Sequence, residues 1–186
     1  CDPSRLEPPA PGRVPWTRAA GMLLGLAVGD ALGNTSESLT PAGRGLRFGE
    51  IRDYLRNECA GGREVGLPSD DTQLAFWTLE QLLEDDGLVP ERLARRFAGS
   101  GRIFGIGSTV RAFLRELDMG TGWLDAKQQS AGNGALMRIA PILLPHLRRP
   151  TTALWADALL CGAVTHDDFA SNACCVAFVQ LLWDAL

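Results

Sequence analysis

Apolar residues recur every three to four positions along most of the chain after residue 15, which is the period of an α-helix that buries one or more faces. No segment alternates apolar and polar residues in the way a half-buried strand does. The pattern therefore predicts a compact, multi-helix, all-α fold. The expected helices cover residues 16–33, 71–86, 90–98, 108–117, 135–147, 151–163 and 169–186, the fifth of them broken by Pro141 and Pro145.

The segments between these helices are weakly periodic. Residues 40–67 are rich in glycine and arginine and are expected to form a long surface loop with at most one short helix near residues 51–56. Residues 118–131 read as a polar loop. Residues 1–15 contain five prolines and few apolar side chains, which predicts an extended, poorly ordered lead-in. The expected organisation is this lead-in followed by the N-terminal portion of a single domain over residues 16–186.

The first and last helices carry unusual features. Gly21, Gly25 and Gly29 lie four residues apart in the first helix, and because glycine weakens a helix, the stripe predicts close packing of another backbone there. A membrane dimerisation motif is the rival interpretation, but the helix is too short and ends in Asp30. The last helix is very apolar and reaches Leu186 without a cap, so we expect the chain to continue and the fold to be completed by a C-terminal part.

Composition narrows the class of protein. A hydrophobic content of 46% with 22% charged residues is typical of a soluble globular protein, and no apolar stretch is long enough to span a membrane. A net charge of -4 argues against a nucleic-acid surface. Five cysteines fit no disulfide framework, which favours a reducing cytoplasm, and the adjacent Cys174 and Cys175 are expected to be buried.

The most informative polar stretch is Ser69-Asp70-Asp71-Thr72, at the start of a predicted helix. Two adjacent carboxylates flanked by hydroxyls form a set of oxygen donors, which hard divalent cations such as Mg²⁺ or Mn²⁺ prefer. Helix capping is the alternative, because serine and aspartate suit a helix N-terminus and its dipole without any ligand. The local sequence leaves both interpretations open.

Three further junctions place polar groups at helix ends. Asp30 ends an apolar helix, where the dipole disfavours a carboxylate, so a specific partner is expected; Glu37 follows a turn that can project it into a cleft. The glycines of Gly132-Asn133-Gly134 predict either free backbone N–H groups for an anion or a plain turn. His166 either borders the core or donates a hydrogen bond to a ligand.

Together these motifs resemble the ADP-ribosylglycohydrolases, over about residues 16–186. The resemblance implies an all-α fold, a centre of two Mg²⁺ or Mn²⁺ ions, and hydrolysis of the bond that joins C1″ of the distal ribose of ADP-ribose to an acceptor. The motifs that carry it are Gly25 to Gly33 with Glu37, Ser69 to Thr72, Gly105-Ile106-Gly107-Ser108-Thr109, Gly132-Asn133-Gly134-Ala135-Leu136-Met137-Arg138 and Thr165-His166.

The resemblance also implies a role for each matching residue. Glu37 is expected to be the catalytic carboxylate, with Asp30 and Thr72 supporting the site from behind. The family's later Asp-x-Asp-Thr/Ser motif is absent, so we expect residues outside this chain to complete the metal centre. The expected metal ligands are Ser69, Asp70 and Asp71, and the expected substrate-binding residues are Ser130, Ala131, Gly132, Asn133, Gly134 and His166, with Phe104 as a candidate wall for adenine.

The expected partner is an ADP-ribosylated protein or a small ADP-ribosyl compound. The chain is expected to act as a cytoplasmic monomer, away from membranes, with nucleic acid a partner only as an ADP-ribosylated substrate. Two alternatives stay open: a relative that binds ADP-ribose or a related nucleotide with weak or no turnover, and a helical structural domain. The sequence selects neither the linkage cleaved nor one of the two metals.

Overall fold

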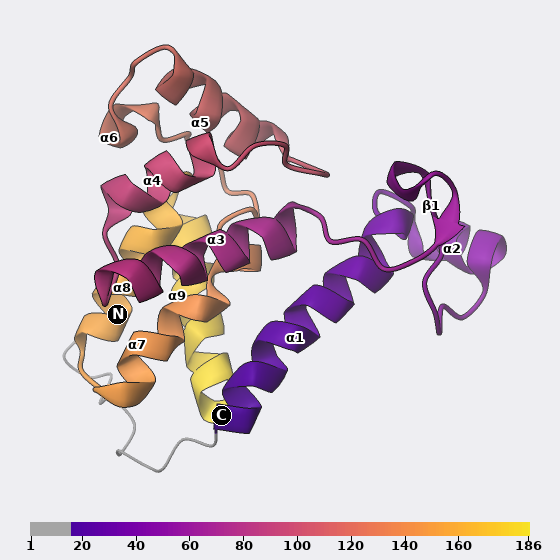
Figure 1. Ribbon diagram of the computed structural model, residues 1–186, viewed down its shortest axis with the longest axis horizontal. Helices are drawn as coiled ribbons and strands as arrows, with labels where there is room; N and C mark the ends of the chain where they lie inside the picture. The colour runs from indigo at the N-terminus through magenta and orange to yellow at the C-terminus, as the bar shows by residue number, and fades with distance from the viewer. Residues whose placement is uncertain (1–15) are drawn as a thin grey trace.

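The computed structural model describes residues 16–186 and confirms the all-α fold, with helices from end to end of that part of the chain (Figure 1). The predicted lead-in, residues 1–15, lies outside the described residues. Short 3-10 helices connect several of the α-helices. The α-helices are α1 (Trp16–Gly33), α2 (Pro41–Phe48), α3 (Asp70–Asp85), α4 (Pro90–Gly99), α5 (Ser108–Asp118), α6 (Trp123–Ala126), α7 (Leu143–Arg148), α8 (Ala153–Ala163) and α9 (Phe169–Ala185).

One hydrophobic core joins α3, α4, α5, α8 and α9. Leu74, Phe97, Phe113 and Leu154 are fully or almost fully buried in it. Each such side chain contributes about 1.5 to 3 kcal/mol when removed from water, so this cluster is the main source of stability. The N-terminus of α3 lies at the edge of the core, where it faces α1 (Figure 1).

Residues 34–67, which we call the projecting segment, extend from the far end of α1 (Figure 1). Thr40 caps α2 by accepting the N–H of Gly43 at 3.1 Å, and Pro41 occupies the first turn. The prediction of a short helix near residues 51–56 is wrong. The α-helix of this segment is α2, which lies earlier in the chain. The rest of the segment comprises η2 (Asn34–Ser36), η3 (Glu58–Ala60) and a two-stranded antiparallel sheet of β1 (Arg56–Asn57) and β2 (Arg63–Glu64).

The glycine stripe of α1 does not pack against another backbone in the described part of the chain. A Cβ atom added to Gly21, Gly25 or Gly29 would meet nothing within 4 Å. Leu24 and Val28 on the same helix are 63% and 47% exposed. The prediction of a close helix contact is therefore wrong for residues 16–186, and α1 presents an open apolar face.

Two other segments differ from the prediction. The loop expected over 118–131 contains the single turn of α6, and the helix expected over 135–147 is divided into η4 (Leu136–Arg138), η5 (Ala140–Ile142) and α7. Proline lacks the backbone N–H that a continuous helix needs, and Pro141 and Pro145 fall inside this stretch. Cys175 is buried as expected, but Cys174 is exposed. None of the helices in residues 16–186 is long and apolar enough to cross a bilayer.

Candidate functional site

Asp30, at the end of α1, reaches across to the start of α3. Its carboxylate accepts the backbone N–H and the hydroxyl of Ser69 at 2.7 and 2.5 Å, and those of Thr72 at 3.2 and 2.6 Å. The side-chain amide of Asn34 donates a fifth hydrogen bond at 3.1 Å. The partner that the sequence required for Asp30 is therefore the N-terminus of a second helix.

This contact decides how α3 is capped. Ser69 occupies the N-cap position but makes no side-chain capping bond, because its hydroxyl donates to Asp30 instead. Asp30 accepts the free N–H of Thr72 in the first turn and brings negative charge to the positive end of the helix dipole. Burial alone raises the pKa of Asp30, but the hydrogen bonds from Ser69, Thr72 and Asn34 outweigh it and hold the pKa below its ordinary value.

Asp70 and Asp71 are consequently not needed as caps. Asp70 accepts a long bond of 3.3 Å from the N–H of Gly107, and Asp71 accepts one of the same length from the Ser69 hydroxyl. Burial raises the pKa of both carboxyls, and neighbouring negative charges add to it: Glu37 and Asp30 for Asp70, and Asp30 and Asp70 for Asp71. Within residues 16–186 no cationic side chain forms an ion pair with either one. This end of α3 is a concentration of uncompensated negative charge.

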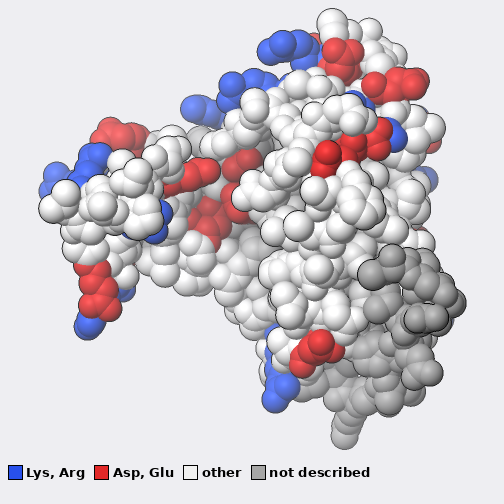
Figure 2. Space-filling view, turned by 180° about the vertical axis from the view of Figure 1, so that it is seen from behind, with Lys and Arg blue, Asp and Glu red and all other residues white. Residues whose placement is uncertain are grey.

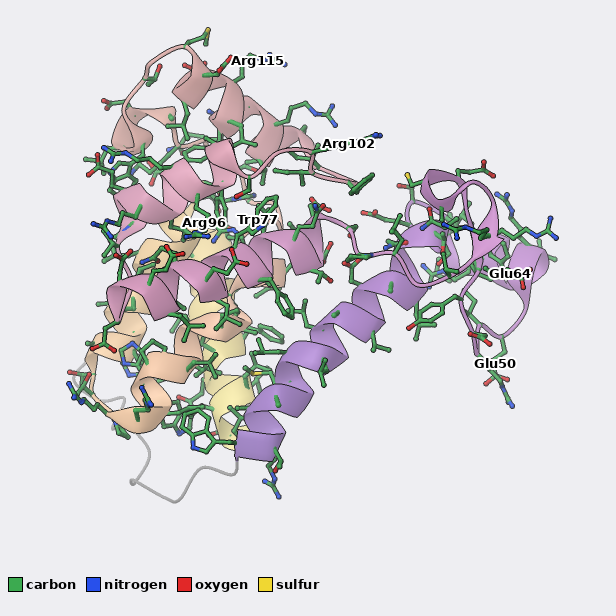
Figure 3. All side chains as sticks on the ribbon, in the orientation of Figure 1. Glu50, Glu64, Trp77, Arg96, Arg102 and Arg115 are labelled. Carbon is green, nitrogen blue, oxygen red and sulfur yellow. The ribbon has the colours of Figure 1, made fainter. Side chains whose placement is uncertain are left out.

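A cleft of about 910 Å³ opens beside this charge. It lies between the projecting segment and the rest of the described chain, which we call the body. Glu37 is exposed and lines it together with Ser69, and Phe104 and Gly105 line it from the side of the body. Figure 2 shows acidic side chains gathered in the hollow at this junction. Figure 3 shows Arg102 on the loop before α5, and the structure places its guanidinium over the Phe104 ring at 4.8 Å.

The oxygen donors fit a hard divalent cation in kind but form only part of a ligand set. Ser69, Asp70 and Asp71 supply a hydroxyl and two carboxylates in one turn, and the raised pKa values mark an excess of negative charge that a cation relieves. Within residues 16–186, however, no group of three or more His, Cys, Asp or Glu side chains is arranged to hold a metal ion. The metal role of these three residues stays a prediction.

The expected anion loop, residues 130–134, is built differently from the prediction. Gly132 and Gly134 do not adopt positive φ, so left-handed backbone is not the reason for glycine here. A Cβ on Gly134 would lie 2.9 Å from Cε1 and 3.1 Å from Nε2 of His166, which means that the ring occupies the space of a side chain. The N–H groups of Asn133 and Gly134 form no hydrogen bond within residues 16–186. The loop therefore offers free donors, although a 3-10 turn rather than an α-helix follows it.

His166 lies beneath this loop and is 1% exposed. Its Nδ1 is 2.8 Å from the Thr165 hydroxyl, which also accepts a bond of 2.8 Å from Nη2 of Arg138. Burial lowers the pKa of His166 to about 4; the positive charge of Arg138 adds to this and Asp168 opposes it. The ring is thus neutral near pH 7. Arg138 and Thr165 were not among the predicted site residues, although both lie inside the motifs that carry the resemblance.

The two groups of polar residues are joined through the start of α5. Gly107 donates its N–H to Asp70, and two residues later the Thr109 hydroxyl lies 2.9 Å from that of Ser130, which in turn accepts the N–H of Gly132 at 3.2 Å. Among the described residues, Glu37 and Ser69 line the 910 Å³ cleft, whereas the carboxylates of Asp30, Asp70 and Asp71, the 130–134 loop and His166 do not. The polar residues thus form two clusters. One contains Glu37 with the carboxylates of Asp30, Asp70 and Asp71, and the other contains the 130–134 loop with His166. The segment from Gly107 to Thr109 links them.

Comparison with known proteins places the chain among similar sequences and folds. The family model described as ADP-ribosylglycohydrolase matches residues 13–186. An ADP-ribosylarginine hydrolase, Tri1, of Pseudomonas putida (strain GB-1) is 32% identical over 182 residues, covering 88% of this chain and 46% of that protein. The ADP-ribosyl-[dinitrogen reductase] glycohydrolase of Rhodospirillum rubrum is 30% identical over 172 residues, which cover 89% of this chain and 56% of that protein.

A solved structure described as an ADP-ribosylglycohydrolase-related protein complex has the same fold, with a TM-score of 0.72 and 31% sequence identity. The match covers 90% of this chain and 56% of that one. The present chain spans about half the length of the curated relatives that it matches.

Proposed function

Because the chain belongs to the ADP-ribosylglycohydrolase family, we propose that it forms part of a metal-dependent hydrolase that removes ADP-ribose from an acceptor by cleaving the C1″ bond of the distal ribose. The observation that carries the proposal is the α3 N-terminus, where Asp30 supplies the cap and leaves Asp70 and Asp71 uncompensated beside a cleft that Glu37 lines. The names of the relatives point to a protein acceptor, with arginine the first linkage to test.

The residues of this chain divide the chemistry between them. Cleavage of a glycosidic bond passes through an oxocarbenium-like state. A nearby carboxylate can stabilise its positive charge or act as a general base toward the attacking water. We assign this role to the exposed carboxylate of Glu37, because its negative charge acts on Asp70 and it forms no ion pair within residues 16–186. The Ser69, Asp70 and Asp71 oxygens would hold a divalent ion, which supplies Lewis-acid stabilisation of ribose oxygens when bound.

The 130–134 loop is the part we assign to the pyrophosphate. The free N–H groups of Asn133 and Gly134 are donors of the type that bind phosphate oxygens, and the neutral ring of His166 lies against the same loop. Fixing the pyrophosphate there would orient the distal ribose toward the acids at α3, which is catalysis by positioning. Phe104 lines the cleft and remains our candidate for the contact with adenine.

The test is release of free ADP-ribose from arginine- and serine-linked ADP-ribosyl peptides with Mg²⁺ or Mn²⁺ added. We expect Glu37→Gln to retain ADP-ribose binding while turnover falls at least 100-fold, the usual scale for loss of a general base. Glu50→Gln is the matched control, because Glu50 lines the same cleft but pairs with Arg52 at 2.7 Å. Normal turnover by the Glu37→Gln protein would remove that residue from the catalytic role.

A second function is favoured by one observation, the incomplete ligand set within residues 16–186. In that case the chain binds ADP-ribose or a related nucleotide with weak or no turnover. Ligand binding raises the melting temperature by mass action, so a rise with ADP-ribose together with intact peptides would establish the binding function. Cleavage above the Glu37→Gln background would exclude it.

A further inference from the structure

Arg138 is buried without a carboxylate partner. Its side chain is fully enclosed, and within residues 16–186 it forms no ion pair. Nη2 donates to Thr165 Oγ1 at 2.8 Å, Nη1 approaches Cys161 Sγ at 3.5 Å, and Nε has no partner, while the Phe97 ring lies 5.0 Å below the guanidinium. An uncompensated buried charge is costly. Stability alone is therefore a poor explanation for this arginine.

The hydrogen bond from Arg138 fixes the direction of the next one. A guanidinium has only donors, so Thr165 Oγ1 must act as its acceptor. The hydroxyl proton of Thr165 then has one available acceptor among the described residues, which is Nδ1 of His166 at 2.8 Å. If Nδ1 carried the ring proton instead, both groups would donate to the same oxygen and the hydroxyl proton would have no acceptor. In a neutral ring the proton consequently sits on Nε2.

Nε2 faces the 130–134 loop. A Cβ atom built on Gly134 would lie 3.1 Å from Nε2, and one on Gly132 would lie 3.6 Å from it. Within residues 16–186 Nε2 has no hydrogen-bond partner, although the histidine is almost completely buried. The N–H groups of Asn133 and Gly134 on the same loop are also free. His166 Nε2 is not among the fully enclosed unpaired atoms of the described chain, and Asn133 is exposed, so these donors are open to an acceptor on a ligand.

We propose that Arg138 is a positioning residue which, through the Thr165 hydroxyl, holds His166 as the Nε2–H tautomer and so presents an N–H donor to a ligand oxygen at the 130–134 loop. That the oxygen belongs to the pyrophosphate of ADP-ribose rests on the proposed function. The fixed tautomer does not, because every hydrogen bond that produces it lies within the chain.

The tautomer is measured directly on the protein without nucleotide. The chain has two histidines, so long-range ¹⁵N–¹H correlation spectra of the labelled, untagged protein at pH 7 resolve both rings, and His146→Gln assigns them. The expected result is a protonated Nε2 and an unprotonated Nδ1 on His166. Thr165→Val should lower the fraction of the Nε2–H tautomer, and Thr165→Ser, which keeps the hydroxyl, should restore it.

Thr78→Val is the matched control. Thr78 is as buried as Thr165, but its hydroxyl donates to the Leu74 carbonyl in α3, so its loss should leave the ring of His166 unchanged. A proton on Nδ1 of His166 in the unmodified protein, or an unchanged tautomer in Thr165→Val, would overturn the proposal.

A titration with ADP-ribose then separates this proposal from the proposed function. We expect Thr165→Val to weaken binding about tenfold relative to Thr165→Ser, the scale of one lost hydrogen bond. Equal affinity of the two variants would overturn the role of the tautomer in binding. Absence of ADP-ribose binding in all variants would refute the proposed function, and the spectra of the free protein would still decide the tautomer.

Discussion

At the scale of single residues, the carboxylates that meet at the start of α3 differ in their hydrogen bonding and in the direction of their pKa shifts. Asp30 accepts five hydrogen bonds, and these hold its pKa below the ordinary value. Asp70 and Asp71 accept one long bond each, and burial raises their pKa values. Asp30 is therefore structural, whereas Asp70 and Asp71 carry negative charge that their surroundings do not compensate, which is why we propose them as metal ligands.

We expect opposite effects on stability from neutralising these groups. Asp30→Asn removes acceptors from buried donors and should lower the free energy of unfolding by about 2 kcal/mol at pH 7. Asp70→Asn and Asp71→Asn should each leave it unchanged or raise it when no divalent cation is present. Urea unfolding in a chelator measures all three, and a loss of stability in Asp70→Asn equal to that in Asp30→Asn would contradict this division.

The free energy of unfolding should change with pH in opposite directions for the two kinds of acid. The folded pKa of Asp30 lies below its reference value of 3.8, so its contribution to stability is present above that value and is lost as the pH falls through the folded pKa. The raised pKa values of Asp70 and Asp71 give a contribution that is present below 3.8 and is lost as the pH rises through those values. The deficit of Asp30→Asn should therefore shrink in acid. Unfolding curves at several pH values test this, and a deficit that grows in acid would refute it.

At the scale of elements, periodicity predicted most of the helices, because long amphipathic or buried segments have a clear period. It failed where local rules compete. Residues 51–56 have helical composition but no cap, whereas Thr40 and Pro41 provide one for α2. The sequence predicts that Gly134 is needed for a backbone conformation that other residues avoid. In the structure, glycine is needed there because the His166 ring, 32 positions later in the chain, occupies the space of a side chain. Contacts between distant segments leave no local pattern to read.

Gly134→Ala tests that interpretation. Its Cβ would lie 2.9 Å from the His166 ring, so the ring or the loop must move, and we expect a loss of about 2 kcal/mol of stability. Gly99→Ala is the comparison, since a Cβ there meets nothing within 4 Å, and it should be neutral or slightly stabilising. Melting temperatures of the two variants give the result. Equal values would mean that the loop accommodates a side chain freely.

At the scale of the whole molecule, the site depends on contacts that join distant parts of the chain. The sequence predicted Asp30, Glu37 and the α3 acids as candidates, but not that Asp30 caps α3 across 39 positions to Ser69. It also gave no sign that Arg138 and Thr165 support His166. The open face of α1 is a third feature of this scale, since helix periodicity predicts burial of its apolar side chains but not which element covers them.

We expect this face to bind an apolar dye. Leu24 and Val28 are exposed, so replacing both with glutamate should lower the fluorescence of bound anilinonaphthalene sulfonate with little change in the melting temperature. Leu74→Ala, a fully buried position, should instead cost about 3 kcal/mol of stability. Dye binding that the double glutamate variant leaves unaltered would place the apolar surface elsewhere.

The projecting segment begins and ends at the same place. The Asn34 amide donates to the Leu67 carbonyl at 2.7 Å, directly beside the bonds between Asp30 and Ser69. Asn34 thus joins the two ends of the segment to each other and to Asp30, and this contact does not involve the residues between the ends, so the interior of the segment is free to change in length at small entropic cost. Changes in the length or sequence of residues 40–65 would therefore reshape the wall of the cleft that Glu37 lines, while Asp70 and Asp71 stay in place.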